Sequence, residues 1–371
     1  MNLAGYSIAI AVGLLAGLLV DRMIVRLVFY RSLFWPGRDR CSHCHASLPW
    51  TWSIPVIGFF LAGRKCRACG SALRSRAMLV QLLTCSLIVG LYHLYFRQVG
   101  HGGPGFVFPR NPFNYWENHL QALWIYHSIL MLLLVAATFI DFDWMMIPDS
   151  VTVPGMILGI GLGTFWHVEL HPVLLFHPDP GFSTGLLSSR FFEDQLGWQS
   201  VPGWLESARV GFNEHWRHHW NAWLGFLTGM VGLLVGGGTV WVVRAICSWI
   251  FRVEAMGFGD VTLMAMIGSF VGWQTAVMIF FLAPVSAAVV GIFAYLISGQ
   301  KAIPYGPHLS IAAVGCVLGW APLWQQTAEI FEHAGIVIFM AGGMVVVLVA
   351  VASLIQAIKM LLFGMETPAH G

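Results

Sequence analysis

Long apolar runs recur along the chain, and they restrict its fold more than any other feature. Of its 371 residues, 57% are hydrophobic and only 10% are charged, whereas a soluble globular domain carries about 25% charged residues. A run of about 20 apolar residues is long enough to cross a bilayer as a helix. The pattern therefore predicts an all-α polytopic membrane protein.

The apolar runs predict about nine transmembrane helices. The N-terminal run has no basic segment before it and no small-residue cleavage site, so we interpret it as a span and not as a cleavable signal peptide. The run near 261–273 is the shortest of the nine. The expected spans are roughly 3–20, 77–96, 122–140, 150–166, 222–250, 261–273, 275–297, 308–320 and 334–362.

The basic residues are concentrated near the N-terminus and predict the orientation. Ten of the nineteen Lys and Arg residues lie between Arg22 and Arg76, and basic loops face the cytoplasm. Alternation then puts 141–149 and 244–260 on the cytoplasmic side. The expected segments are a first helix (1–21), a cytoplasmic four-cysteine module (22–76), helices carrying Asp141 (77–166), an extracytoplasmic insert (167–220), helices carrying Asp260 (221–325), and an extra C-terminal helix with a tail (326–371).

The basic segment contains two Cys-x-x-Cys pairs, Cys41/Cys44 and Cys66/Cys69, separated by 21 residues. Four thiolates with this kind of spacing can close a tetrahedral site, which suits structural zinc. A reducing cytosol disfavours disulfides. A thiol redox motif or a chance pattern is the alternative interpretation, and His43 and His45 compete as ligands.

Two acidic segments border apolar runs. Asp260 follows the turn Gly257-Phe-Gly259, and Asp141 lies in Ile140-Asp-Phe-Asp143. Because a charge at the bilayer centre costs at least about 2.5–3.5 kcal/mol, such acids are functional candidates. Two carboxylates that share a site titrate as a coupled pair and hold one proton between them. One ionised and one protonated acid suit the hydrolysis of a peptide bond.

Other acids near these segments compete for a role, and a buried acid is also often structural. Asp149 follows Pro148 and opens an expected span, so a helix-capping role is natural. Asp143 either supports Asp141 or faces water. Glu254 is either solvated or close to the pair.

Taken together and in this order, the motifs resemble those of the prepilin peptidase family, the bifunctional type IV leader peptidases and N-methyltransferases of bacterial membranes. The resemblance spans roughly residues 3–325. It rests on Ile140-Asp-Phe-Asp143 with Ile147-Pro-Asp149, on Gly257-Phe-Gly-Asp260, on the cysteine pairs, and on Ile303-Pro-Tyr-Gly-Pro307.

The resemblance implies that Asp141 and Asp260 are catalytic and that Cys41, Cys44, Cys66 and Cys69 hold structural zinc. It implies an endopeptidase of the bacterial inner membrane that removes the basic leader of type IV prepilins or type II secretion pseudopilins at the cytoplasmic face. S-adenosylmethionine enters as a cofactor only through this resemblance. The expected partners are these substrates and the lipid bilayer, and we expect no nucleic acid.

The chain departs from the family pattern mainly in or near the cytoplasmic module. Thr51-Trp52 replaces an acidic-polar pair, Gln81 stands where glutamate is usual, and Thr262 stands where lysine is common. These departures bear more on methyl transfer than on proteolysis. The 167–220 insert and the last span match no part of the family pattern.

Two other readings compete. In a non-enzymatic transporter, or an assembly factor with a zinc clip, the two aspartates would form an ion path near the bilayer midplane and not lie at helix ends. A presenilin-like protease with other substrates shares the Gly-x-Gly-Asp motif, but that reading leaves the four cysteines unexplained.

Overall fold

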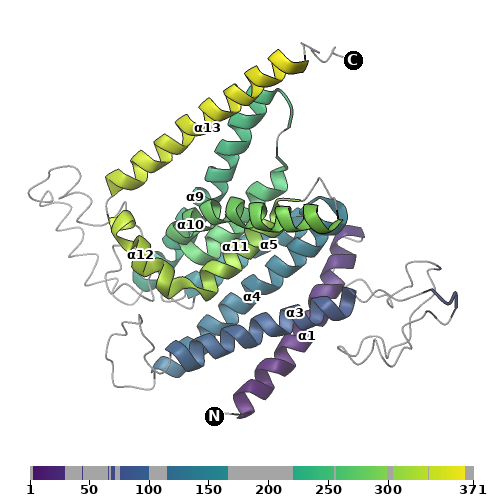
Figure 1. Ribbon diagram of the computed structural model, residues 1–371. Helices are drawn as coiled ribbons and strands as arrows, with labels where there is room; N and C mark the ends of the chain where they lie inside the picture. Colours follow the sequence, from purple (N-terminus) through teal and green to yellow (C-terminus); the bar gives the residue numbers. More distant parts are fainter. Residues whose placement is uncertain are drawn as a thin grey trace, which may run out of the picture.

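A computed structural model describes residues 3–29, 44, 66, 68–71, 76–99, 115–165, 220–254, 256–298, 304–332 and 334–363. These residues contain helices and no strand, which confirms the all-α class for this part of the chain. Cys41 and nearly all of the 167–220 insert lie outside the described residues. The elements, drawn in Figure 1, are α1 (Leu3–Phe29), α3 (Arg76–His93) continued by the π-helical turn η2 (Leu94–Val99), α4 (Tyr115–Trp144), α5 (Asp149–Phe165), α9 (Trp220–Phe251), α10 (Phe258–Ser298), α11 (Gly306–Leu318), α12 (Trp320–Glu332) and α13 (Ala334–Phe363).

Six of the described helices are long and apolar enough to cross a membrane, namely α1, α3, α4, α9, α10 and α13. Two shorter apolar helices, α5 and α11, accompany them. The chain is therefore a multi-pass membrane protein. The helix α12 was not expected from the apolar runs.

The two spans expected at 261–273 and 275–297 form a single element, α10, which is broken at Gly272. The backbone there has φ 78° and ψ 171°, a conformation that glycine adopts far more readily than other residues. Gly272 lies near the end of the first expected span, two residues before the expected boundary at residue 274.

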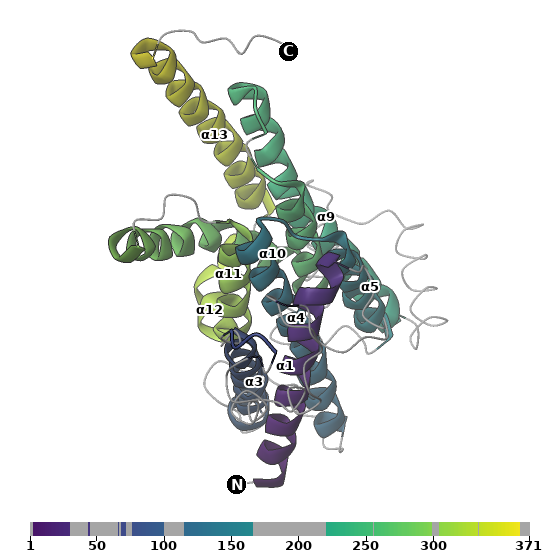
Figure 2. The same ribbon diagram turned by 90° about the vertical axis from the view of Figure 1, so that its right-hand side faces the viewer.

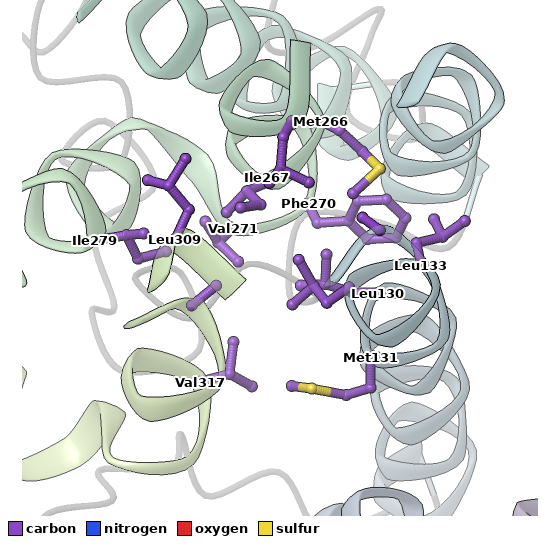
Figure 3. Packing of buried hydrophobic residues seen from close by; sticks show 14 of the residues in the cluster. Leu130, Met131, Leu133, Met266, Ile267, Phe270, Val271, Ile279, Leu309 and Val317 are labelled. Carbon is purple, nitrogen blue, oxygen red and sulfur yellow. The ribbon is translucent and has the colours of Figure 1, made fainter. Parts of the chain in front are cut away.

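Three helices, α4, α10 and α11, enclose the central apolar core. Figure 3 shows Leu130 and Leu133 of α4 on the side of Met266, Ile267, Phe270 and Val271 of α10. Met131 of α4 points toward Val317 of α11, and Leu309 also comes from α11. The hydroxyl of Tyr126 on α4 donates to the carbonyl of Gly159 on α5 over 3.0 Å. The helix ends that carry the acidic motifs therefore project from one common core.

The helix α9 packs closely along the first half of α10. A Cβ on Gly232 of α9 would collide with the carbonyl oxygen of Gly268 on α10, and the reverse is also true. Because small residues let helix backbones touch, this crossing fixes α9 against α10.

The last helix, α13, packs on α9 and α12. Figures 1 and 2 both show it at the opposite end of the molecule from the pair formed by α1 and α3. It coincides with the expected last span.

Candidate active site

Asp141 and Asp260 are both buried, with 5% and 9% of their surfaces exposed. Asp141 lies in the last turn of α4, and Asp260 lies in the first turn of α10. The charge of Asp141 acts on the carboxyl group of Asp260, so the structure brings the two expected residues together electrostatically. We call them the acid pair.

Ile147 connects three motifs that are distant in sequence. It is buried, with 8% of its surface exposed. A Cβ on Gly259 would lie 3.0 Å from the Cβ of Ile147, and a Cβ on Gly306 would lie 2.8 Å from its Cδ1. The Ile-Pro-Asp, Gly-Phe-Gly-Asp and Pro-Tyr-Gly-Pro segments therefore meet at this side chain.

The amino end of α11 points at Asp141. The carboxylate of Asp141 accepts a hydrogen bond from the backbone N–H of Gly306, the first residue of α11. A Cβ at Gly306 would lie 2.5 Å from Oδ2 of Asp141, so only glycine leaves room for this approach. First-turn N–H groups have no partner within their own helix, and the partial positive charge there favours an anionic oxygen.

Asp260 also lies at a helix amino end, that of its own helix α10. Each carboxyl group of the acid pair thus faces the positive end of a helix dipole, which offsets part of the cost of a charge in a buried place.

The backbone ends α4 just beyond Asp141. Met145 has φ 50°, which is unusual for a residue with a side chain. Its N–H donates to the carbonyl oxygen of Asp141 over 2.9 Å. This is the hydrogen bond of a left-handed helix cap, and such a cap is usually formed by glycine. Helix α4 therefore extends to Trp144, a few residues beyond the expected end of its span.

The other acids of the first segment are not in the pair. Asp143 forms an ion pair with Arg76, the first residue of α3, and both side chains are partly exposed. Asp149 begins α5, and its side chain is exposed. This ion pair joins the end of α4, where Asp141 lies, to the start of α3. It therefore favours a supporting role for Asp143 over one in which the side chain only faces water.

Glu254 is solvated, because its side chain is 88% exposed. Its charged partner in the described part of the chain is Arg244 on α9, with Nη2 3.4 Å from Oε1. It therefore does not belong to the acid pair.

Tyr305 precedes Gly306 and is the N-cap residue of α11. It is half-buried, and the charge of Asp260 acts on its hydroxyl group. Tyr305 and Gly306 thus bring the Pro-Tyr-Gly-Pro segment to both members of the acid pair.

Sequence reasoning missed the roles of Ile147, Gly306 and Arg244. Ile147 and Gly306 lie inside the Ile-Pro-Asp and Pro-Tyr-Gly-Pro motifs, but the sequence does not show which motifs contact each other. Arg244 belongs to no recognised motif. Its contacts with the segment between α9 and α10 (residues 252–257, which we call the α9–α10 turn) depend on the three-dimensional structure.

The position of the acid pair within its helices bears on the transporter alternative. Both acids lie in terminal helical turns, whereas an ion path would need acids near the middle of the spans. The alternative of a transporter or assembly factor is therefore not favoured.

Three of the four expected zinc ligands, Cys44, Cys66 and Cys69, come together, and we call them the thiol cluster. All of their sulfur atoms lie within 4.8 Å of one another. The sulfurs of Cys44 and Cys66 are 3.7 Å apart. Two sulfurs bound tetrahedrally to one zinc ion at about 2.3 Å would be about 3.8 Å apart. The donor set and its spacing fit a metal ion.

The second Cys-x-x-Cys pair has the tight turn that such a site needs. The N–H of Gly70 donates to the carbonyl of Cys66 over 2.8 Å, and Gly70 has φ 71°. The hydroxyl of Ser71 lies 3.0 Å from the sulfur of Cys69. Hydrogen bonding by Ser71 lowers the pKa of the Cys69 thiol and so favours the thiolate that binds metal.

Two protein-family models match the chain. The Bacterial Peptidase A24 N-terminal domain matches residues 11–95, and the Type IV leader peptidase family matches residues 204–292. All four cysteines lie in the first match and Asp260 lies in the second. Asp141 lies between them, so its assignment depends on the geometry.

Several curated proteins are similar over most of the chain, and each is named prepilin leader peptidase/N-methyltransferase. The protein of Myxococcus xanthus is 27% identical over 78% of this chain and 62% of its own length. That of Stutzerimonas stutzeri is 28% identical over 82% of this chain and 78% of its own length. That of Aeromonas hydrophila is 27% identical over 78% and 72%. No solved structure matches the chain.

Proposed function

Because the chain belongs to the type IV leader peptidase family, we propose that it is an intramembrane aspartyl endopeptidase with Asp141 and Asp260 as its catalytic residues. The observation that carries the proposal is the burial of these two acids at adjoining helix ends. By analogy with the relatives, the substrates are prepilins or pseudopilins. The positive-inside pattern supports cleavage at the cytoplasmic face of the bacterial inner membrane.

The proposed reaction uses one proton held by the acid pair. The ionised carboxylate takes a proton from a water molecule, whose oxygen then attacks the carbonyl carbon of the scissile peptide bond. The protonated carboxyl group donates its proton to the carbonyl oxygen, which gives a neutral tetrahedral diol. When the diol collapses, the carboxylate that gave up its proton takes one back from a diol hydroxyl group, and the C–N bond breaks. The other carboxyl group gives the proton that it took from water to the leaving amine. The pair ends in its starting protonation state.

Co-expression with a candidate prepilin tests the proposal. We expect the wild-type protein to remove the leader and Asp260→Asn to lower the rate by at least about 10³-fold, because an amide replaces the acid–base group. Unchanged thermal unfolding of the purified variant is the control for folding. Leader removal by Asp260→Asn at the wild-type rate would exclude the proposed chemistry.

We also propose that Cys41, Cys44, Cys66 and Cys69 bind one structural zinc ion. The close approach of three sulfurs supports this, and Cys41 lies outside the described residues. Zinc would cross-link the module that precedes α3, and the chemistry needs no zinc-bound water. We expect about one zinc per chain in the purified protein and loss of that zinc in Cys44→Ser. A metal-free wild-type protein would contradict the site.

Methylation of the new N-terminus is a second candidate activity, supported by the names of the relatives. S-adenosylmethionine as the methyl donor depends on those names and on no residue of this chain. Mass spectrometry of the processed pilin, with and without S-adenosylmethionine, shows whether the new N-terminus is methylated. An unmodified N-terminus in both samples would remove this activity.

A further inference from the structure

The side chain of Arg244 on α9 contacts the turn that leads from α9 to Asp260. Its Nε donates to the carbonyl oxygen of Met256 over 2.9 Å. Its guanidinium carbon lies 5.7 Å from the centre of the Phe258 ring. A third contact, with Glu254, is 3.4 Å long. One side chain thus contacts Glu254 and Met256 in the turn and Phe258 in the Gly-Phe-Gly-Asp motif.

These contacts differ in weight. The pair with Glu254 is exposed to solvent on the carboxylate side, so it contributes little. The bond to the Met256 carbonyl has a charged donor and fixes the backbone directly. The flat guanidinium group also suits the face of an aromatic ring. The backbone bond and the ring contact therefore carry most of the effect.

The turn needs an external anchor because it packs poorly on its own. Apart from its chain neighbours, and among the described residues, the atoms nearest to an ideal Cβ on Gly257 are Oδ2 of Asp260 and the Gly259 nitrogen, both 3.9 Å away. Two glycines within three residues give the chain many alternative conformations, and these must be suppressed to hold an acid in place. Arg252, at the start of the same turn, has φ 56°.

The effect of Arg244 on Asp260 is geometric. The contacts that the structure shows for Arg244 are with Met256, Phe258 and Glu254, all of which precede Asp260 in the chain. Arg244 contacts the backbone before Asp260 and α9 is fixed against α10 by the Gly232–Gly268 crossing. The anchor therefore belongs to a helix that packs closely on α10.

We infer that Arg244 is a positioning residue, which holds the α9–α10 turn so that Asp260 meets Asp141. The inference rests on the proposed function for its kinetic consequences. It also has a structural consequence, the rigidity of the turn, that can be measured without substrate.

The test compares three purified variants with the wild type. Arg244→Lys keeps the charge but cannot form the backbone bond and the ring contact together. Phe258→Leu keeps Arg244 and removes only the ring. Arg252→Gln is the matched control. It removes a charge from the same turn and leaves the contacts of Arg244 with Met256 and Phe258 in place. The readouts are kcat and KM for a prepilin, the melting temperature, and hydrogen exchange of the α9–α10 turn.

We expect Arg244→Lys to lower kcat about 10- to 100-fold with KM within about twofold, because a displaced catalytic group loses rate and not affinity. The turn should exchange faster in both Arg244→Lys and Phe258→Leu, with a smaller loss of kcat in the latter. Arg252→Gln should match the wild type.

Wild-type kcat in Arg244→Lys, or an equal loss in Arg252→Gln, would overturn the inference. Wild-type exchange of the turn in both Arg244→Lys and Phe258→Leu would also overturn it, whatever their activity. Failure of the wild-type protein itself to cleave prepilins would instead count against the proposed function, and the exchange measurement would still decide the role of Arg244.

Discussion

Asp141 ends one helix, whereas Asp260 begins another, and the two are held by different means. Asp141 depends on residues from elsewhere in the chain, since it accepts the N–H of Gly306, and its neighbour Asp143 pairs with Arg76. Asp260 depends on the turn directly before it, which Arg244 contacts. Ile147 joins the two sides through Gly259 and Gly306.

This difference explains why one half of the site is easier to find from the sequence. The Gly-x-Gly-Asp motif carries its own turn, so a local pattern identifies Asp260, and a family model includes it. Asp141 is held by contacts from distant helices, since Gly306 of α11 donates to it and Arg76 of α3 pairs with its neighbour Asp143. It lies outside both family matches. A local sequence pattern therefore identifies Asp260 more readily than Asp141.

Gly306→Ala gives the largest effect that we expect on the Asp141 side. A methyl group there would lie 2.5 Å from Oδ2 of Asp141 and 2.8 Å from Ile147, so α11 or the carboxylate must move. We expect kcat for prepilin cleavage to fall about 100-fold, as for other small displacements of catalytic groups. Gly315→Ala on the same helix is the control, because its Cβ would meet nothing within 4 Å. Equal activity of the two variants would mean that α11 does not position Asp141.

Arg76→Gln should have an intermediate effect, since it removes the ion pair with Asp143. Both side chains are partly exposed, so the pair is worth about 0.2–1 kcal/mol. We expect a fall in kcat of about 1.4- to fivefold, which is that energy converted to a rate. The exchanged pair Arg76→Asp with Asp143→Arg should recover part of the rate. A double exchange that is slower than either single variant would show that the pair does not support Asp141.

Met145→Gly should have the smallest effect and act on stability. A side chain at positive φ costs about 1–2 kcal/mol, and glycine loses about 0.5–1 kcal/mol of that gain through entropy. We therefore expect a melting temperature higher by about 1–3 °C with kcat unchanged. Met146→Gly, one residue further from this cap, should lower the melting temperature slightly. A lower melting temperature for Met145→Gly would argue against strain at this position.

The sequence predicted the helical membrane class, the break near Gly272, the acid pair and the clustering of the thiols that the structure describes. These features have local signals, such as apolar runs, a glycine turn and cysteine spacing. It did not predict that Ile147 links three motifs or that Arg244 contacts the turn, because both depend on helices distant in sequence. It also missed α12, whose polar positions interrupt any apolar run, although Trp320 and Trp324 are buried.

The proposed chemistry requires that Asp141, and no other acid of its segment, is the partner of Asp260. Prepilin cleavage by the purified variants Asp141→Asn and Asp149→Asn distinguishes the two acids, because Asp149 lies close in sequence but is exposed. We expect a loss of at least about 10³-fold for Asp141→Asn and a rate near that of the wild type for Asp149→Asn. Cleavage at the wild-type rate by Asp141→Asn, or loss of cleavage only in Asp149→Asn, would show that Asp141 is not the partner of Asp260.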